Sequence, residues 1–318
     1  MSAVEPLPTR QLGRTGLRVP EICFGGAVLA SMPSIFGYDV PEERALETVR
    51  AVLRGPVGFL DTAAGYGGGR SERIIGAALA EIGGPPPGFV LATKVDRDEE
   101  TGDYSAAQVR RSLEGSLERL GLDRLPLLYL HDPEHISFEA GMAAGGPVEE
   151  LTRIREEGLA EHIGVAGGPV GLLERYVATG AFEVVLTHNR WTLIDRSAGP
   201  LLDAAREAGV GVINAAPFGG GILAKGPEGQ PRYAYAAADP VVLERVGEIV
   251  AACDRHGVPL PAAAIRFSTR DPRIASTVIG VTRPERVTET LELHQWSIPD
   301  ELWPTLDGLA APADHWQN

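Results

Sequence analysis

The chain has 318 residues, enough for one large domain or for two of ordinary size. Acidic side chains outnumber basic ones by 43 to 29, and the formal net charge of −14 argues against a general affinity for nucleic acid or anionic membranes. No stretch approaches the ~18 uninterrupted apolar residues of a membrane span, and residues 1–20 lack the apolar core of a secretory signal. We therefore expect a cytoplasmic protein without nucleic-acid or membrane partners, either a monomer or a small homo-oligomer.

Short apolar runs alternate with amphipathic stretches from one end of the chain to the other. This alternation is typical of parallel strands joined by helices, and about eight runs match the strand number of an α/β fold, the (β/α)8 TIM barrel. Ahead of the first run, "QLGRTGLRVP" predicts a small hairpin that turns at "RTG" and closes the barrel floor. The predicted strands are residues 21–26, 58–63, 89–95, 125–132, 162–167, 182–189, 209–217 and 275–281.

The amphipathic stretches carry apolar residues at spacings of three and four, as helices with one buried face do. In one of them, Val109, Leu113, Leu117 and Leu120 form a stripe behind the candidate N-cap Ser105. The predicted helices are residues 41–53, 70–82, 105–121, 148–158, 172–180, 200–209, 239–257 and 283–293.

No strong linker divides the sequence, so we expect a single domain over residues 1–318. The segments "EIGGPPPG" and "AKGPEGQPRYAYAAADP" are interpreted as loops of that domain, the second as a flap. The tail "APADHWQN" is either a loop that folds over the pocket through Trp316 or disordered. Cys23 and Cys253 lack a CxxC or metal-type spacing, which is typical of reduced thiols that only pack.

Three successive predicted strands deliver polar side chains that could act together. Asp61 lies at the end of the second strand with Tyr66 just beyond it, Lys94 lies in the third strand, and His131 lies at the end of the fourth. Active sites of α/β barrels gather at the carboxyl ends of the strands, so we expect these groups to face one another. Taken singly, an aspartate before a helix is commonly a cap and a loop tyrosine commonly packs. A lysine in an apolar run is costly unless it is paired, and the joint pattern favours catalysis.

A phenol next to an ammonium indicates proton transfer. The ordinary pKa of tyrosine, about 10, is too high for proton exchange at neutral pH. We expect Lys94 to lower the pKa of Tyr66, and Asp61 to hold the lysine charged and in position. His131 could donate a hydrogen bond to the same substrate oxygen.

The segment "HDPEH" invites a metal interpretation through His131, Asp132, Glu134 and His135. Pro133 breaks the helix that would place both histidines on one face, and no other cluster of ligands matches a zinc pattern. We therefore expect no metal here, and His135 to be an exposed loop residue.

Phosphate binding can be sought in two kinds of motif. A Rossmann G-x-G-x-x-G fingerprint is absent from the sequence. In "VIGVTRPERVTETL", Thr282, Arg283 and Arg286 lie on a loop that enters a helix, where backbone N–H groups and guanidinium groups can hold a phosphate. Considered alone, such arginines are commonly just solvated surface.

These residues, in this order, resemble the aldo-keto reductase superfamily over almost the whole chain. "LGRTGLRVPEICFGGA" resembles the family's opening, "FLDTAAGYGGGRSERIIGAAL" its Asp and Tyr signature, "LATKV" its lysine segment and "VIGVTRPERVTETL" its cofactor signature. The resemblance implies a TIM barrel, the catalytic tetrad Asp61, Tyr66, Lys94 and His131, and a nicotinamide dinucleotide bound without a Rossmann domain. "FGGAVLA", "YGGGRSE" and "NRWTLID" are most similar to the aldose dehydrogenase branch, which oxidises sugars such as fucose or arabinose to lactones.

The cofactor contacts implied by the resemblance include departures from the common family pattern. Ala166 and Gly167 stand where many members have Ser-Asn, and His188 or Asn189 stands near the usual nicotinamide-binding glutamine. Ala215 stands where many reductases stack a tyrosine on the nicotinamide ring.

The choice between NAD and NADP stays open in the resemblance. Gly280 aligns with a family lysine that often meets the 2′-phosphate of NADP, whereas Arg286 remains as a partner for that phosphate, and Glu289 aligns with an adenine contact. The implied cofactor positions are Gly26, Ala166, Gly167, His188, Asn189, Ala215, Pro217, Phe218, Gly219, Gly221, Gly280, Thr282, Arg283, Arg286 and Glu289.

The resulting prediction is an NAD(P)-dependent oxidoreductase that passes hydride between the nicotinamide and an aldose or related hydroxyl or aldehyde compound, with Tyr66 as general acid/base. Met32, Phe36 and Trp191 are the predicted walls of the substrate pocket, although each could equally be ordinary packing. The alternative enzyme is an NADPH-dependent reductase of aldehydes or ketones, including pyridoxal-type aldehydes. The alternative of another class is a nicotinamide-binding regulatory subunit with little turnover.

Overall fold

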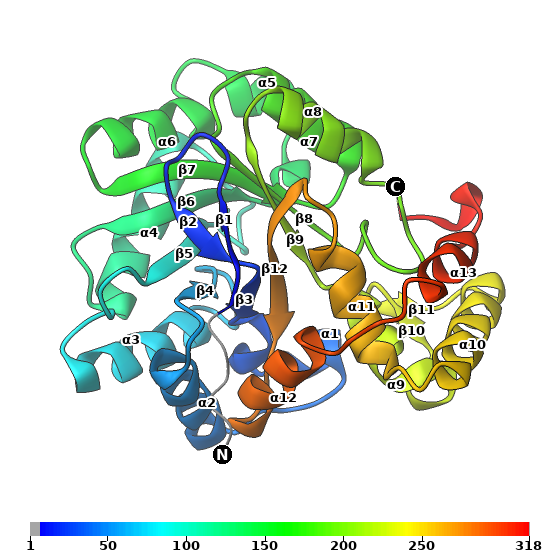
Figure 1. Cartoon of the computed structure of the whole chain (residues 1–318). Helices are drawn as coiled ribbons and strands as arrows, with labels where there is room; N and C mark the ends of the chain where they lie inside the picture. Colours follow the sequence, from blue (N-terminus) through cyan, green and yellow to red (C-terminus); the bar gives the residue numbers. More distant parts are fainter. Residues whose placement is uncertain (1–6, 318) are drawn as a thin grey trace.

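Eight parallel strands close into a barrel in the computed structural model, which describes residues 7–317. Each barrel strand pairs with the next along the chain, and the last, β12, pairs with the first, β3 (Figure 1). This confirms the predicted (β/α)8 barrel; positions 1–6 and 318 of the predicted domain lie outside the described residues. The barrel strands are β3 (Ile22–Gly25), β4 (Phe59–Asp61), β5 (Val90–Val95), β6 (Leu125–His131), β7 (Ala160–Gly167), β8 (Val184–His188), β9 (Gly211–Ala215) and β12 (Ile274–Gly280).

Helices surround the barrel, and all eight predicted helices are present (Figure 1). They are α2 (Glu42–Arg54), α3 (Arg70–Ile82), α4 (Ala106–Leu120), α6 (Pro147–Glu156), α7 (Val170–Ala178), α8 (Gly199–Glu207), α10 (Pro240–Arg255) and α12 (Glu285–His294). Further helices of the described chain are α1 (Pro33–Phe36), α5 (Phe138–Met142), α9 (Ile222–Gly229), α11 (Leu260–Thr269) and α13 (Leu302–Gly308).

Helix α4 shows how local sequence sets an element. The Ser105 side chain accepts a hydrogen bond from the backbone N–H of Gln108, which confirms the predicted N-cap. Val109 and Leu113 are fully buried against the barrel, and Gly121 ends the helix in the left-handed conformation, with a φ of 68°.

Helix α11 is not predicted by the spacing of apolar residues, and its burial explains why. Seven of its ten residues are buried, because the helix packs between α9, α10, α12 and β12. Its sequence "LPAAAIRFST" therefore lacks the polar face on which the helical pattern depends.

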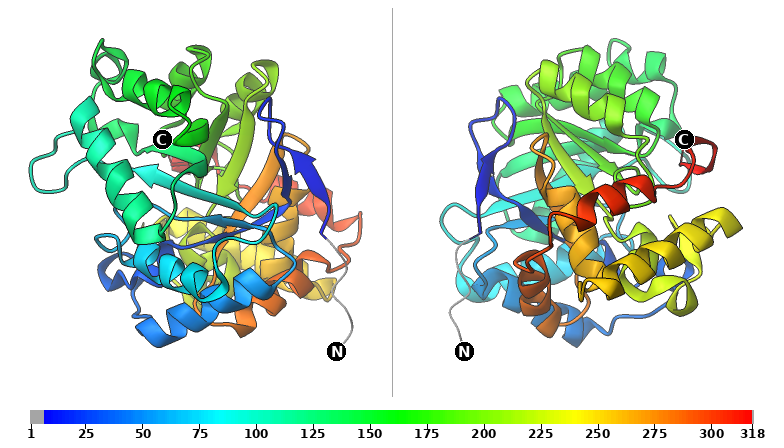
Figure 2. Two further views of the ribbon diagram at one scale, coloured as in Figure 1. Left: turned by 90° about the vertical axis from the view of Figure 1, so that its left-hand side faces the viewer. Right: turned by 45° about the vertical axis from the view of Figure 1, so that its right-hand side comes forward.

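The predicted floor hairpin is formed by β1 (Thr9–Gln11) and β2 (Arg18–Pro20), which lie at one end of the barrel (Figures 1 and 2). Leu12 is fully buried and packs with side chains of the barrel interior. A β-carbon at Gly13, whose φ is +53°, would lie 2.2 Å from the amide nitrogen of Gly211, the first residue of β9. Glycine is required for this approach, and the hairpin closes the end at which the strands begin.

The predicted flap, residues 224–240, is more regular than a loop. It contains the end of α9 and a second hairpin, formed by β10 (Arg232–Tyr233) and β11 (Ala236–Ala237). The Tyr233 hydroxyl donates to the carbonyl oxygen of Asn189 at 2.8 Å. This bond anchors the second hairpin to the segment that follows β8.

The C-terminal tail is held by polar contacts up to the last described residue. The backbone N–H of Gln317 donates to Asp195 Oδ2 at 2.6 Å, and the indole N–H of Trp316 donates to the carbonyl of Ala311 at 2.7 Å. The described part of the tail therefore packs beside the segment after β8, and Asn318 lies outside the described residues.

Apolar side chains fill the barrel interior and the layer between strands and helices. Cys23 belongs to the interior, and Cys253 belongs to a separate cluster around α10, α11 and α13. Both thiols are free and buried, which agrees with the expectation that they only pack. Over residues 7–317, no helix has both the length and the apolar character needed to cross a lipid bilayer.

Candidate active site

The structure brings the four predicted tetrad side chains together at the carboxyl end of the barrel. Asp61 and His131 are the last residues of β4 and β6, Lys94 is near the end of β5, and Tyr66 lies in the loop between β4 and α3. The Lys94 Nζ donates to Asp61 Oδ1 at 2.6 Å and to the carbonyl of Thr62 at 2.7 Å. It lies 3.1 Å from the Tyr66 hydroxyl oxygen, so one ammonium connects the carboxylate to the phenol.

The ammonium of Lys94 is buried, with 1% of its side chain exposed. Burial alone would lower the pKa of Lys94, but the adjacent Asp61 carboxylate and the Tyr66 hydroxyl outweigh burial and hold the pKa above its ordinary value. Lys94 therefore stays charged. Asp61 Oδ2 is buried without a hydrogen-bond partner among residues 7–317.

The pKa of Tyr66 differs from the expectation drawn from the sequence. Burial raises this pKa well above 10, and the Lys94 ammonium opposes the rise without reversing it. The predicted net lowering is therefore wrong for the protein alone, because the loss of water around the hydroxyl was not visible in the sequence. Tyr66 is a protonated phenol at neutral pH.

The loop that carries Tyr66 is shaped by glycines. Gly67, Gly68 and Gly69 all have positive φ values, of 60°, 58° and 80°. A β-carbon on Gly67 would lie 2.7 Å from the carbonyl oxygen of Ala30. The run "GYGGGR" therefore folds tightly enough to place the phenol over Lys94 before α3 begins.

His131 has a partner that the sequence reasoning missed. Its Nδ1 lies 2.6 Å from Oδ1 of Asp96, the residue directly after β5. Burial alone would lower the pKa of His131, but the Asp96 and Asp132 carboxylates raise it above its ordinary value. The available signal was the strand period of two, which places Asp96 on the same side of the chain as Lys94.

The remaining residues of "HDPEH" follow His131 in the chain and lead away from the His131–Asp96 pair. His135 ends the short 3-10 helix η2 (Pro133–His135) and is exposed, as expected. Within residues 7–317, no group of three or more His, Cys, Asp or Glu side chains is arranged to hold a metal ion.

His188 and Asn189 lie at the carboxyl end of β8. The Asn189 amide nitrogen lies 3.1 Å from His188 Nδ1, and Asn189 Oδ1 is buried without a hydrogen-bond partner in the described part of the chain. Burial lowers the pKa of His188 to about 4, so the imidazole is neutral at pH 7. Since Nδ1 accepts from Asn189, the proton of this neutral ring is on Nε2.

Arginines lie where the chain enters α12, as predicted. Arg283 and Arg286 both pair with Glu289, at 3.0 Å and 3.2 Å, and their side chains are 44% and 45% exposed. Gly280 ends β12, and a β-carbon there would meet Val28 at 3.0 Å.

The other predicted cofactor positions also lie at strand ends or just beyond them. They follow β3, end β7, end β9, or belong to the 3-10 helix η3 (Gly219–Gly221) and the turn that leads into it. These positions are Gly26, Ala166, Gly167, Ala215, Pro217, Phe218, Gly219 and Gly221.

The predicted substrate residues do not stay together. Met32 is the N-cap of α1, and the Phe36 ring lies 5.8 Å edge-on from the ring of Tyr235. Tyr235, in the turn between β10 and β11, was missed because no local pattern links this turn to the barrel mouth. Its hydroxyl is close to the Asn189 amide and the Asp132 charge.

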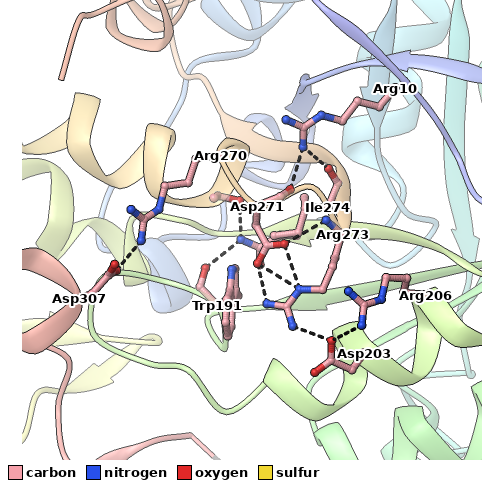
Figure 3. A network of polar contacts seen from close by, with 11 residues as sticks. Arg10, Trp191, Asp203, Arg206, Arg270, Asp271, Arg273, Ile274 and Asp307 are labelled. Carbon is pink, nitrogen blue, oxygen red and sulfur yellow. Dashed lines mark hydrogen bonds and ion pairs between the residues drawn. The ribbon is translucent and has the colours of Figure 1, made fainter. Parts of the chain in front are cut away.

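Trp191 lies elsewhere, in the outer layer. Its ring packs 5.7 Å from the ring of Phe267 on α11. The Arg273 guanidinium lies beside the Trp191 ring, 5.0 Å from its centre (Figure 3). It lines a cavity of about 470 Å³ with Arg206, Arg270 and Asp271 among its other walls. The structure therefore does not place Trp191 with the tetrad.

Comparisons with known proteins agree with this architecture. The sequence model of the Aldo/keto reductase family matches residues 21–311. The chain is 31% identical to D-threo-aldose 1-dehydrogenase of a Pseudomonas species, covering 96% of this chain and 97% of that protein. It is 32% identical to L-galactose dehydrogenase of Arabidopsis thaliana, with coverage of 95% and 94%. The fold matches aldo-keto reductase AKR11C1 of Bacillus halodurans in its holo form, with a TM-score of 0.79, 23% identity and coverage of 96% and 97%.

Proposed function

Because the chain belongs to the aldo/keto reductase family and is an oxidoreductase, we propose that it transfers hydride between NAD(P) and an aldose or a related hydroxyl or aldehyde compound. The observation that carries the proposal is the Lys94 ammonium, 3.1 Å from the Tyr66 hydroxyl and 2.6 Å from Asp61. In this arrangement the charged Lys94 ammonium can hold the Tyr66 hydroxyl in position and can stabilise the phenolate when the proton has left.

Tyr66 moves the proton in this proposal. In reduction, the neutral phenol donates its proton to the substrate oxygen, and Lys94 stabilises the phenolate that forms. In oxidation, Tyr66 must first lose its proton. Since its pKa is raised, the oxidative rate increases with pH across the neutral and mildly alkaline range.

Two side chains at β8 fit the carboxamide of a nicotinamide ring. The carboxamide has N–H donors and a carbonyl acceptor. Asn189 Oδ1 is a buried acceptor without a partner among residues 7–317, and neutral His188 keeps an N–H donor on Nε2. The bound nicotinamide would exchange hydride with the substrate carbon. The role of His188 and Asn189 is to fix the orientation of that ring.

The α12 arginines fit the dinucleotide phosphate of either cofactor form. Arg283 and Arg286 already share the Glu289 carboxylate, so a 2′-phosphate must compete with that partner for their donors. We therefore propose that both NAD and NADP are used, with the 2′-phosphate contributing little extra affinity.

The substrate class follows from the names of the two relatives, which are dehydrogenases of D-threo-aldose and L-galactose. A cyclic sugar presents one reacting hydroxyl at its anomeric carbon and further hydroxyls for the loops over the mouth. Steady-state turnover of L-galactose, L-fucose and D-arabinose with NAD and NADP, against pyridoxal and simple aldehydes with NADPH, separates the proposed enzyme from the alternative reductase.

The role of Tyr66 is tested by Tyr66→Phe, which keeps the ring and removes the proton. We expect turnover to fall by about 100-fold or more while the dissociation constant for the cofactor, measured by fluorescence titration, changes little. Full turnover in this variant would show that the proton-transfer assignment is wrong. Cofactor binding by the wild-type protein without turnover of any compound in the panel would favour a nicotinamide-binding regulatory role.

A further inference from the structure

Asp96 connects two parts of the candidate active site through a single carboxylate. Its Oδ1 lies 2.6 Å from His131 Nδ1, and its Oδ2 accepts the backbone N–H of Gly65, the residue before Tyr66, at 2.6 Å. A β-carbon on Gly65 would lie 3.0 Å from the Asp96 carboxyl group, so the glycine permits this approach. The Asp96 and His131 side chains are 19% and 12% exposed.

The contact with Nδ1 determines which forms of His131 can donate to a substrate. Burial alone would raise the pKa of Asp96, but His131 and the backbone N–H of Gly65 outweigh burial and hold this pKa below its ordinary value, so Asp96 is a carboxylate. A carboxylate accepts hydrogen bonds and has none to donate, so the imidazole nitrogen facing Asp96 must carry a proton. A neutral His131 then has its only proton on Nδ1 and a bare lone pair on Nε2. Only the imidazolium form, protonated on both nitrogens, can donate from Nε2.

We propose that Asp96 is a positioning residue with two roles. It fixes the orientation of the His131 ring and keeps a proton on Nδ1, so that Nε2 donates a hydrogen bond only when the ring is cationic. It also anchors the backbone before Tyr66. This inference rests on the proposed hydride-transfer function for its effect on turnover. Its effect on His131 stands independently of turnover.

The effects of other charged groups on His131 must be distinguished from the effect of Asp96. Asp132 Oδ1 lies 3.7 Å from His131 Nε2, and the Lys94 ammonium opposes protonation of His131. The Tyr66 ring lies 5.6 Å from the His131 ring, and His188 on β8 is close enough to interact with the charge of His131. Of these groups, Asp132 provides the matched control. Asp132→Asn removes a nearby negative charge and leaves the Nδ1 contact in place, and its left-handed backbone, with a φ of 42°, suits asparagine.

The decisive variant is Asp96→Asn, which is close to isosteric. The asparagine oxygen can still accept from Gly65, while its amide group donates to Nδ1, so the neutral imidazole carries its proton on Nε2. The experiment is NMR of the full chain with isotope-labelled histidine, in which a His131→Gln spectrum identifies the signal of His131 among those of seven histidines.

In the wild-type protein we expect the neutral His131 ring to carry its proton on Nδ1. In Asp96→Asn we expect the proton to move to Nε2 and the titration midpoint of His131 to fall by about 1 to 3 pH units. In Asp132→Asn we expect a smaller fall and an unchanged tautomer. If the neutral His131 ring of the wild-type protein carries its proton on Nε2, the proposal is wrong. It is also wrong if the spectrum of Asp96→Asn shows the same tautomer and the same titration midpoint of His131 as the wild type.

Turnover provides the second readout. Reduction by the wild-type enzyme should decline as pH rises through the pKa of His131, whereas Asp96→Asn should lose this decline because its neutral ring donates from Nε2. Asp96→Ala also removes the acceptor of the Gly65 backbone N–H. Its kcat should be about 10-fold lower than that of Asp96→Asn, with unchanged cofactor affinity. A pH profile of Asp96→Asn identical to the wild type would contradict the proposal. If the NMR changes occur but no substrate turns over, the positioning role stands and the proposed function fails.

Discussion

The two ends of the barrel both hold charged side chains inside the protein, but they use them differently. At the floor, the Arg10 guanidinium donates to the carbonyls of Asp271 at 2.8 Å and Ile274 at 2.7 Å (Figure 3). It also donates to the carbonyl of Thr269 at 2.6 Å and pairs with Glu21 at 2.7 Å. These carbonyls lie at the end of α11, in the turn that follows it and at the first residue of β12, and the last turn of a helix leaves backbone acceptors without intrahelical partners. Both terminal nitrogens of Arg10 are thereby engaged by protein acceptors, and a ligand would have to displace these contacts.

At the mouth, the charged groups are connected but not saturated. Lys94 uses its three donors on Asp61, Thr62 and Tyr66, yet Asp61 Oδ2 and Asn189 Oδ1 stay buried without partners among the described residues. Unpaired buried acceptors are costly in a folded protein unless a ligand or water completes them. Arg10 at the floor is bonded mainly to backbone carbonyls of the fold, whereas Lys94 at the mouth connects side chains to which we assign the chemistry.

The largest expected effect comes from breaking the pair at the mouth. Lys94→Met leaves the Asp61 carboxylate buried alone, since the side chains are only 1% and 6% exposed. We expect the free energy of unfolding to fall by about 3–5 kcal/mol, and turnover to fall by about 100-fold or more. Denaturant unfolding and steady-state kinetics measure the two losses.

A second substitution separates stability from catalysis at the same site. Adding Asp61→Asn to Lys94→Met removes the uncompensated charge, so part of the lost stability should return while turnover stays low. Turnover near the wild-type level in either variant would contradict the assignment of this end of the barrel to chemistry.

A smaller effect, on stability alone, is expected at the floor. Arg10→Ala removes charge-assisted bonds to three carbonyls from a side chain that is 26% exposed, and should lower the free energy of unfolding by about 1.5–3 kcal/mol. The kcat of the folded protein should be unchanged. Arg18 lies in the same hairpin, and its side chain donates within residues 7–317 only to Thr9, at the surface. Arg18→Ala should therefore change stability by no more than about 0.5 kcal/mol. A loss of kcat in Arg10→Ala would show that the two ends are coupled.

The contrast between the two ends also explains what the sequence could predict. Strands that are buried on both faces give continuous apolar runs, so the barrel and its order follow from the pattern. Lys94 stands out because an ammonium in such a run needs partners, and Asp61, Tyr66 and His131 follow from their places at neighbouring strand ends. Local sequence is enough for these residues because each one lies in a barrel strand or, for Tyr66, in the short loop that directly follows one.

Other features depend on contacts between distant segments. Trp191 follows a strand end in the sequence, yet Asn189, with a φ of 59°, turns the chain there and the ring packs on α11. Tyr235 reaches the mouth through a hairpin whose position depends on the bond from Tyr233 to Asn189. The pKa of Tyr66 is raised because burial, with the Asp61 and Asp132 charges, outweighs the Lys94 ammonium, and sequence position gives no measure of burial.

The smallest effect is a pH dependence of stability at the floor. Burial alone would raise the pKa of Asp271, but hydrogen bonds and charge from Arg273, with Nη2 at 2.6 Å from Oδ2, outweigh it and hold the pKa below its usual value. A carboxyl group whose pKa is lowered by folding stabilises the protein above its unfolded pKa, near about 3.9, and this contribution is lost as pH falls through the folded pKa. Asp271→Asn should therefore lower the Tm at pH 7 slightly, by an amount equivalent to about 1 kcal/mol or less, and the difference from the wild type should shrink below about pH 4.

Asp314→Asn, at a carboxylate that is 81% exposed, is the control and should follow the wild type at every pH. If the Tm difference between Asp271→Asn and the wild type stays constant down to acid pH, the stabilisation by Asp271 does not depend on its charge.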